Sequence, residues 1–173
     1  MIQTKTEIIG DTGPSFLHGV NDLKVIVKGS VGNDSACNVK NSKFTIFGSC
    51  GNNFGNNAVN SEFYIFGDCR ENAFSKAKKS KIVIGGQIQG DFLFNDDVIA
   101  VILNLKGESY NLIPGTKPGI IYLRGEKEKF KNVSLKPVAE SDEDVYLPLI
   151  SEFARQFNYS LSEIKSLPFY RME

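Results

Sequence analysis

The sequence predicts an all-β solenoid, a parallel β-helix of about six or seven 19-residue coils followed by C-terminal α-helices. Three observations predict this fold. Glycines stand at positions 10, 29, 48, 67 and 86, at a constant spacing of 19. A short segment of β-branched or aromatic residues precedes most of them, as in 25–28 and 63–66. Residues 19 apart between these segments are also alike, so the whole unit repeats and not the strand alone.

We call a set of residues that lie 19 positions apart a column. In a coil whose turns stack at the spacing of neighbouring strands, each column forms a ladder along the stack. Two apolar columns are predicted to form the core ladder: Ile8, Val27, Ile46, Ile65 and Ile84 in the first, and Val31, Cys50, Cys69 and Ile88 in the second. Cys50 and Cys69 are therefore interpreted as small buried side chains and not as a redox pair, because a reactive thiol needs exposure.

The glycines are predicted to mark corners, where φ is positive or a neighbouring backbone comes too close for a Cβ atom. The structural repeat glycines are Gly10, Gly29, Gly32, Gly48, Gly51, Gly55, Gly67 and Gly86. A polar column holds Asp34, Asn53, Asn72 and Asp91. Hydrogen-bonded stacking is favoured over calcium binding there, because the short glycine-aspartate repeats of calcium-binding rolls are absent.

Two looser coils follow the regular repeat. They are the segment 101–107, after a two-residue insertion, and the segment 120–125, one residue short of the period. A last strand is expected at 133–135. We divide the chain into a repeat region, 1–138, and a helical cap of the same domain, 139–173.

The cap is predicted from an amphipathic pattern. Apolar residues at 149, 150, 153, 154 and 157 form one helical stripe, which Asn158 is expected to end. Ser160 and Glu163 form a capping box that predicts a short second helix. Phe47 and Phe66 lie one turn apart on outward positions of the coil. They are candidates for the seat of the tail helix or for a docking patch, and the helix seat is favoured.

Composition excludes several classes of function. The 173 residues carry 20 acidic and 20 basic side chains, which argues against a nucleic-acid or anionic-membrane binder. Three cysteines without a Cys-x-x-Cys motif indicate a reduced, cytoplasmic protein. His18 is the single histidine and has no acidic partner at a fixed spacing, so a corner position is favoured over a catalytic role. Cys37 falls in a column with polar residues and is expected to be more exposed than the other two cysteines.

The spacing of the glycines also resembles the glycine pattern of a known family. The segments Gly29-x-x-Gly32-x-x-x-Ala36, Gly48-x-x-Gly51-x-x-x-Gly55 and Gly67-x-x-Arg70-x-x-x-Phe74 resemble the GXGXG repeat domain. That domain forms the C-terminal part of the glutamate synthase large subunit, and a relative is a structural subunit of formylmethanofuran dehydrogenase. The stretches 132–135, 149–150 and 157–162 resemble the tail of the glutamate synthase domain. The family fold is a right-handed parallel β-helix.

The resemblance implies a non-catalytic structural subunit that holds glutaminase and synthase chains of an oxidoreductase complex in place. It implies no catalytic, cofactor-binding or metal-binding residues in this chain. Two alternatives stay open: a structural subunit like that of formylmethanofuran dehydrogenase, and an independent β-helix binding protein. Self-association also stays open.

Overall fold

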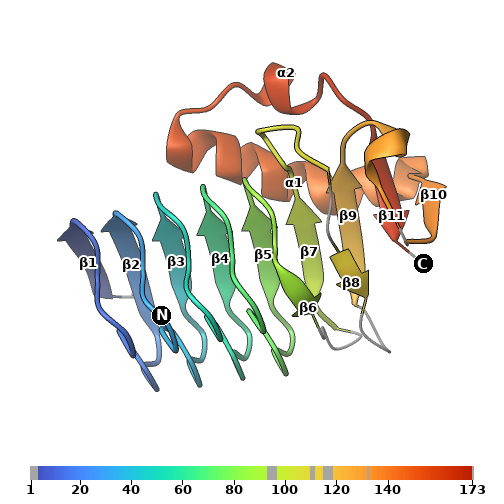
Figure 1. Cartoon of the computed structure of the whole chain (residues 1–173). Helices are drawn as coiled ribbons and strands as arrows, with labels where there is room; N and C mark the ends of the chain where they lie inside the picture. The colour runs from blue at the N-terminus through green and yellow to red at the C-terminus, as the bar shows by residue number, and fades with distance from the viewer. Residues whose placement is uncertain (1–3, 93–96, 110–111, 115–118, 132, 173) are drawn as a thin grey trace.

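The chain winds into a parallel β-solenoid. A computed structural model describes residues 4–92, 97–109, 112–114, 119–131 and 133–172. Strands β1 to β5, β7 and β9 lie side by side in chain order and delimit about six turns (Figure 1). The predicted solenoid with C-terminal helices is thereby confirmed.

The elements are short, as expected for a solenoid whose turns meet only their neighbours. The main sheet contains β1 (Thr4–Ile9), β2 (Leu23–Lys28), β3 (Lys43–Ile46), β4 (Glu62–Ile65), β5 (Lys81–Ile84), β7 (Ile99–Ile102), β9 (Ile120–Arg124), β11 (Phe169–Met172) and β10 (Leu135–Pro137). A second sheet pairs β6 (Gly90–Phe92) with β8 (Leu112–Pro114). The helices are η1 (Lys127–Lys129), α1 (Glu140–Phe157) and α2 (Leu161–Ile164).

The register of the first strands equals the sequence period. Strands β1 to β5 pair in parallel with partners 19 residues apart, as in Lys43 opposite Glu62. The next turn is one residue shorter, because Ile84 pairs with Ile102, and the one after is two residues longer, because Ile102 pairs with Leu123. The order of the irregular turns predicted from the sequence is therefore wrong.

The reason for this error lies at Asn104. Asn104, and not Gly107, follows Gly86 in the stack, since its N–H donates to the Gly86 carbonyl at 3.2 Å. Its backbone is left-handed, with a φ of 44°, a conformation that asparagine tolerates better than most residues. The sequence interpretation aligned glycine with glycine, although asparagine occupies this corner.

The inside of the coil is filled by stacked apolar side chains. Phe44 and Phe63 stack with ring centroids 5.2 Å apart, and Phe54 and Phe74 meet Phe63 edge-on. A buried column of serines, Ser42, Ser61 and Ser80, lies beside them. Each serine hydroxyl donates to a carbonyl two residues earlier and accepts an N–H from the preceding turn. Burial of these hydroxyls is therefore compensated by hydrogen bonds.

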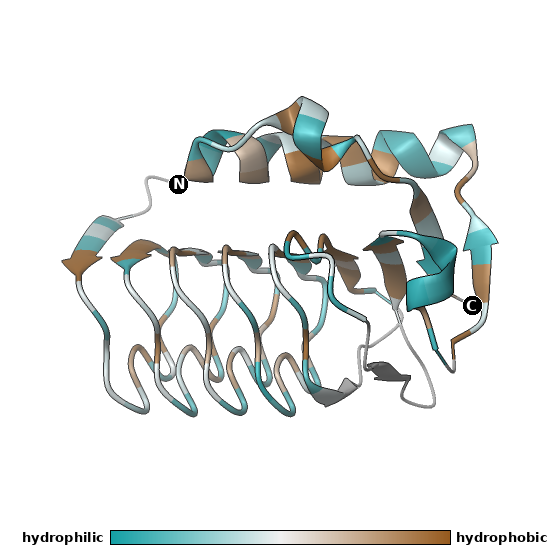
Figure 2. Ribbon diagram, turned by 45° about the horizontal axis from the view of Figure 1, so that its top comes forward, coloured by the Kyte–Doolittle hydropathy of each residue, from teal (hydrophilic) through white to brown (hydrophobic). Residues whose placement is uncertain are grey.

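Helix α1 forms a second layer on the outer face of the main sheet (Figures 1 and 2). Its buried stripe packs on outward side chains of the strands, among them Tyr64, Val83 and Tyr122. The ring centroid of Phe157 lies 4.9 Å from that of Phe47 and 5.3 Å from that of Phe66. The prediction that Phe47 and Phe66 seat the tail helix is confirmed. Asn158 ends α1 in a left-handed conformation, and the Ser160 hydroxyl caps α2, both as predicted.

The C-terminal end of the main sheet is closed by two antiparallel strands. β11 pairs with β9, and β10 pairs with the free side of β11. The last strand before the helices covers Leu135–Pro137, two residues later than the predicted 133–135. Strand β11 has no counterpart in the sequence prediction, because its four residues carry no repeat and no helical period.

Candidate functional site

The structure separates two reasons for the repeat glycines. A Cβ atom at Gly48 would lie 2.7 Å from the backbone of Gly29, and Gly29, Gly67 and Gly86 are equally close to the preceding turn. Gly55 has a φ of +67°, and its missing side chain leaves room for the ring of Phe74. In the first turn, Gly10 has a φ of +99° with open space around it. Close approach thus governs the interior glycines, and conformation governs Gly10 and Gly55.

The residues of the predicted core ladder lie inside the coil. Those of the interior turns are buried: Val27, Ile46, Ile65, Ile84, Val31, Cys50, Cys69 and Ile88. Ile8, in the first turn, is half-buried and packs against them. Cys50 and Cys69 lie in register on adjacent turns as free cysteines, and burial raises the pKa of the Cys50 thiol well above its ordinary value. A protonated, buried thiol is a poor nucleophile.

Cys37 is more exposed than Cys50 and Cys69, at 6% against 1% and 0%, as predicted, although all three are buried. Its side chain is buried, and its Sγ lies 3.1 Å from the Asn53 carbonyl oxygen of the next turn. Burial raises the pKa of this thiol too. The residues on both sides of Cys37, Ala36 and Asn38, have left-handed backbone.

His18 lies at an exposed corner of the first turn. Its Nε2 is 2.9 Å from the Asn38 carboxamide nitrogen of the next turn. In the polar column, the Asn53 carboxamide donates to the Asp34 carboxylate at 2.8 Å, which is the predicted hydrogen-bonded stacking. The side chain of Asp91 lies outside the described residues.

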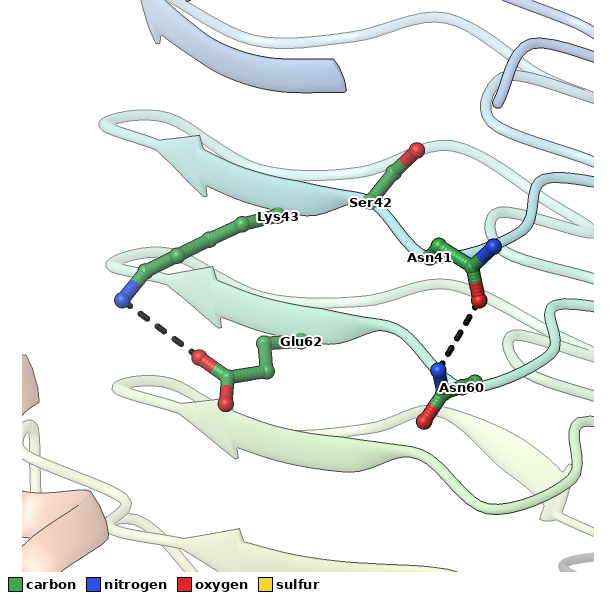
Figure 3. A pocket seen from close by; sticks show the side chains of 5 residues that line it. All are labelled: Asn41, Ser42, Lys43, Asn60 and Glu62. Atoms are coloured by element: carbon green, nitrogen blue, oxygen red, sulfur yellow. Dashed lines mark hydrogen bonds and ion pairs between the residues drawn. The ribbon is translucent and has the colours of Figure 1, made fainter. Parts of the chain in front are cut away.

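A shallow hollow of about 310 Å³ lies on the described surface beside β3 and β4 (Figure 3). It is lined by Asn41, Ser42, Lys43, Asn60 and Glu62. These residues come from the corners before β3 and β4 and from the first residue of each strand, where the repeat places equivalent positions side by side. The Asn60 carboxamide donates to Asn41 Oδ1 at 2.8 Å, and Lys43 Nζ lies 3.4 Å from Glu62 Oε2.

The lysine at this hollow is held by carboxylates. Lys43 Nζ also lies 2.6 Å from Glu152 Oε1 of helix α1 and 4.8 Å from the centre of the Tyr64 ring. Hydrogen bonds from Arg155, together with those from Lys43, hold the pKa of Glu152 far below its ordinary value. Burial and the charge of Glu62 raise the pKa of Tyr64. The ion pairs join Lys43 of β3 to Glu62 of β4 and to Glu152 of α1, so the cluster fastens α1 to the sheet.

A second polar cluster fastens the start of α1. Asp142 accepts hydrogen bonds from Tyr122 Oη at 2.9 Å, from Arg171 at 3.0 Å and from the Ala139 N–H at 2.9 Å. The bond from Ala139 is the main cause that lowers the pKa of Asp142. Burial and the Asp142 carboxylate raise the pKa of Tyr122 to about 12. The cluster joins α1, β9 and β11, three segments whose sequences show no sign of this contact.

Arg124 holds the end of helix α2. Its guanidinium is buried and donates to the carbonyls of Leu103, Glu163 and Ile164. Cations stabilise the negative C-terminal end of a helix, and here the arginine bonds directly to the carbonyls of Glu163 and Ile164 at the end of α2. Sequence reasoning missed this residue, because a lone arginine at the end of a strand has no recognisable pattern.

The two polar clusters provide hydrogen bonds and packing contacts. Their charged side chains pair with one another, Lys43 with Glu62 and Glu152, and Arg171 with Asp142. Among the described residues, no group of three or more His, Cys, Asp or Glu side chains is placed to hold a metal ion. The described helices include none long and apolar enough to cross a membrane. No protein-family model, curated protein or solved structure matches this chain.

Proposed function

We propose that this protein is a non-catalytic structural subunit that positions the glutaminase and synthase chains of a glutamate-synthase-like oxidoreductase complex. The resemblance of the repeat and tail to the GXGXG repeat domain suggests this role. One observation carries the proposal: polar side chains of the coil form hydrogen bonds to the neighbouring turn of the same chain.

One continuous ladder illustrates this use. Side-chain oxygens of Asp11, Ser30, Ser49 and Asp68 each accept the backbone N–H of the next turn, at 2.7 to 3.0 Å. The ladder ends at Gln87. Such bonds make each turn resist sliding or bending against its neighbour, because every displacement breaks a bond in register. A stiff rod with repeating faces suits a part that sets the distance between other chains.

The exposed corners supply a surface suited to partner chains. Asn57 Nδ2 donates to Asn38 Oδ1 at 3.0 Å, so this pair stands in a defined orientation on the outside of the coil. Preorganised amide groups lose little freedom when they bind, which favours a polar, separable interface. The partners proposed are the glutaminase and synthase chains, and the cytoplasmic location stays a prediction from cysteine usage.

Reconstitution tests the proposal. Purified glutaminase and synthase chains from the same source are mixed with this protein, and complex formation is followed by sedimentation velocity. Glutamate formation is measured with glutamine and, separately, with ammonia. We expect the protein to join both chains and to raise only the glutamine-dependent activity, because that activity needs the two catalytic chains held together.

Two variants sharpen this test. His18→Ala should retain full effect, since the histidine lies at an exposed corner. Asn38→Gly combined with Asn57→Gly removes both amide groups and keeps residues that tolerate the left-handed backbone at these positions, so it should weaken complex formation without changing the melting temperature by more than a few degrees. The proposal is contradicted if the protein fails to bind the glutaminase chain or fails to bind the synthase chain. Loss of a measured activity in folded His18→Ala contradicts it as well, because it indicates chemistry carried out by this chain.

A further inference from the structure

The two ends of the solenoid differ in how their outermost strands are protected. At the C-terminal end the last strand, β10, is three residues long and includes Pro137, two features that discourage pairing with another chain. At the other end β1 is six residues long, without proline, and pairs with β2 alone among the described residues. A six-residue edge strand without proline is a template for a further strand whose charges match those of Lys5 and Glu7.

The backbone groups on this free edge are known from the later turns. There the N–H groups of the outward positions point to the preceding turn, as Glu62 N does to Ser42 O at 2.9 Å and Phe66 N does to Ile46 O at 2.9 Å. The equivalent positions of β1 are Lys5, Glu7 and Ile9. Their N–H and C=O groups therefore point away from β2, in a row along the edge.

Apolar side chains accompany this edge. The first turn leaves five residues only half-buried against the core: Ile8, Phe16, Leu17, Val20 and Leu23. In later turns the equivalent side chains are sealed by a turn on each side. Ile9, on the outer face of β1, is 80% exposed. The N-terminal end thus combines unpaired backbone with incompletely covered apolar surface.

We propose that this end binds a second copy of the chain, with the two β1 strands paired antiparallel about a two-fold axis at Thr6. The main sheets then join into one sheet with both inner faces on the same side, and the half-buried side chains of the two first turns face one another. The interface is isologous and closes after two copies, because the opposite ends are protected. This proposal does not depend on the proposed function.

The charged side chains of β1 favour a second copy of the chain as the partner, and they favour one register of pairing. With Thr6 opposite Thr6 of the partner subunit, Lys5 lies opposite Glu7 of the partner subunit, and Glu7 lies opposite Lys5 of the partner subunit. Both are hydrogen-bonded pairs, because these residues carry the free N–H and C=O groups. Moving the axis to Glu7 or to Lys5 would place like charges directly opposite, which is destabilising. The sequence of β1 is complementary to itself in one register.

A charge exchange in the full-length protein tests the proposal. Sedimentation equilibrium at low salt gives the dimer dissociation constant of the wild type, of Lys5→Glu, of Glu7→Lys and of the double variant. Each single variant should weaken the dimer about tenfold or more, because each change acts twice across the axis. The double variant should restore it. Lys78→Glu, an equal charge change at an exposed corner of the fourth turn, should leave the constant unchanged.

Disulfide trapping gives a second readout. Cα atoms of a non-hydrogen-bonded antiparallel pair lie about 4.5 Å apart, within the range that a disulfide spans. Thr6→Cys should therefore form a covalent dimer under mild oxidation, whereas Lys5→Cys should not, because its neighbour across the axis is Glu7 of the partner subunit. The native cysteines are buried and do not compete.

These measurements can overturn the proposal in two ways. A wild type that stays monomeric at the highest soluble concentration contradicts it, and leaves the edge to a different partner. A dimer that is indifferent to both single charge changes, and that Thr6→Cys does not trap, also contradicts it, because it uses another surface.

Discussion

The middle turns of the solenoid and its C-terminal region are held together in different ways. In the turns between residues 23 and 89, strand residues pair with residues 19 positions away, and several columns repeat one residue type, with isoleucine over isoleucine, serine over serine or asparagine over asparagine. In the region after residue 97, the decisive contacts join unlike residues at irregular separations, such as Tyr122 with Asp142 and Arg124 with Ile164. The first kind of structure repeats a local solution, and the second depends on single contacts.

This difference teaches where the fold tolerates change. A turn in the stack can lose one ladder contact and keep many equivalent ones. Substitutions at a polar corner are therefore expected to have small effects on stability. A buried position in the stack is not, because the same volume is filled in every turn. In the C-terminal region each polar cluster has no equivalent elsewhere, so one substitution removes the whole connection.

The largest expected effect comes from a charge inside the stack. Ile46→Asp places an unpaired carboxylate in a column that is fully buried, and should cost about 5 kcal/mol or more. We expect cooperative loss of the solenoid, measured by circular dichroism during urea unfolding. The matched control is Ile9→Asp at an 80% exposed position, expected to change stability by less than about 0.5 kcal/mol. Similar losses in both variants would show that column burial does not govern stability.

Removal of the main contact of the helix should have the next largest effect. Phe153 is fully buried between α1 and the sheet, and its ring lies against the space left by Gly85. Phe153→Ala should cost about 3–5 kcal/mol. We expect hydrogen exchange to accelerate in 140–172 before it does so in the middle turns. Equal acceleration in both regions would mean that they unfold as one unit and that the proposed distinction is wrong.

Two glycines of one column test whether glycine is needed because the backbone of the preceding turn comes close. A Cβ atom at Gly51 would lie 2.6 Å from the Asn33 nitrogen of the preceding turn, whereas one at Gly13 meets nothing within 4 Å. Gly51→Ala should therefore lower the stability by about 1–3 kcal/mol, and Gly13→Ala by only a few tenths. Thermal unfolding of the two variants measures the difference. Equal losses would show that close approach of the preceding turn does not explain the glycine at position 51.

Acid should loosen the C-terminal region first. The pKa values of Asp142 and Glu152 are lowered in the folded state, so the stability that they add is complete above their ordinary values near 4 and is lost as pH falls through the lower folded values. Asp142→Asn should cost about 1 kcal/mol at neutral pH and should flatten the loss below pH 4. Stability measured from pH 7 to 2 tests this. An unchanged slope in Asp142→Asn would exclude this carboxylate as the cause.

The sequence carried much of the architecture because the solenoid repeats its solution. The period of 19, the buried columns through Ile46 and Cys50, and the seats of α1 on Phe47 and Phe66 follow from spacing and polarity alone. The order of the short and long turns did not, because both asparagine and glycine can form the corner at Asn104. The column of Cys37 predicted that it is the most exposed of the three cysteines, and only the structure shows that it is nevertheless buried.

Local periodicity thus determined the coil, its inward residues and the existence of the tail helix, since each turn meets copies of itself at a constant separation. Tertiary structure alone decided which carboxylate meets Lys43, how Arg124 closes α2, and that β11 and β10 seal one end while β1 leaves the other open. These contacts join segments 20 to 109 residues apart, and no local pattern encodes which distant partner will lie within hydrogen-bonding distance.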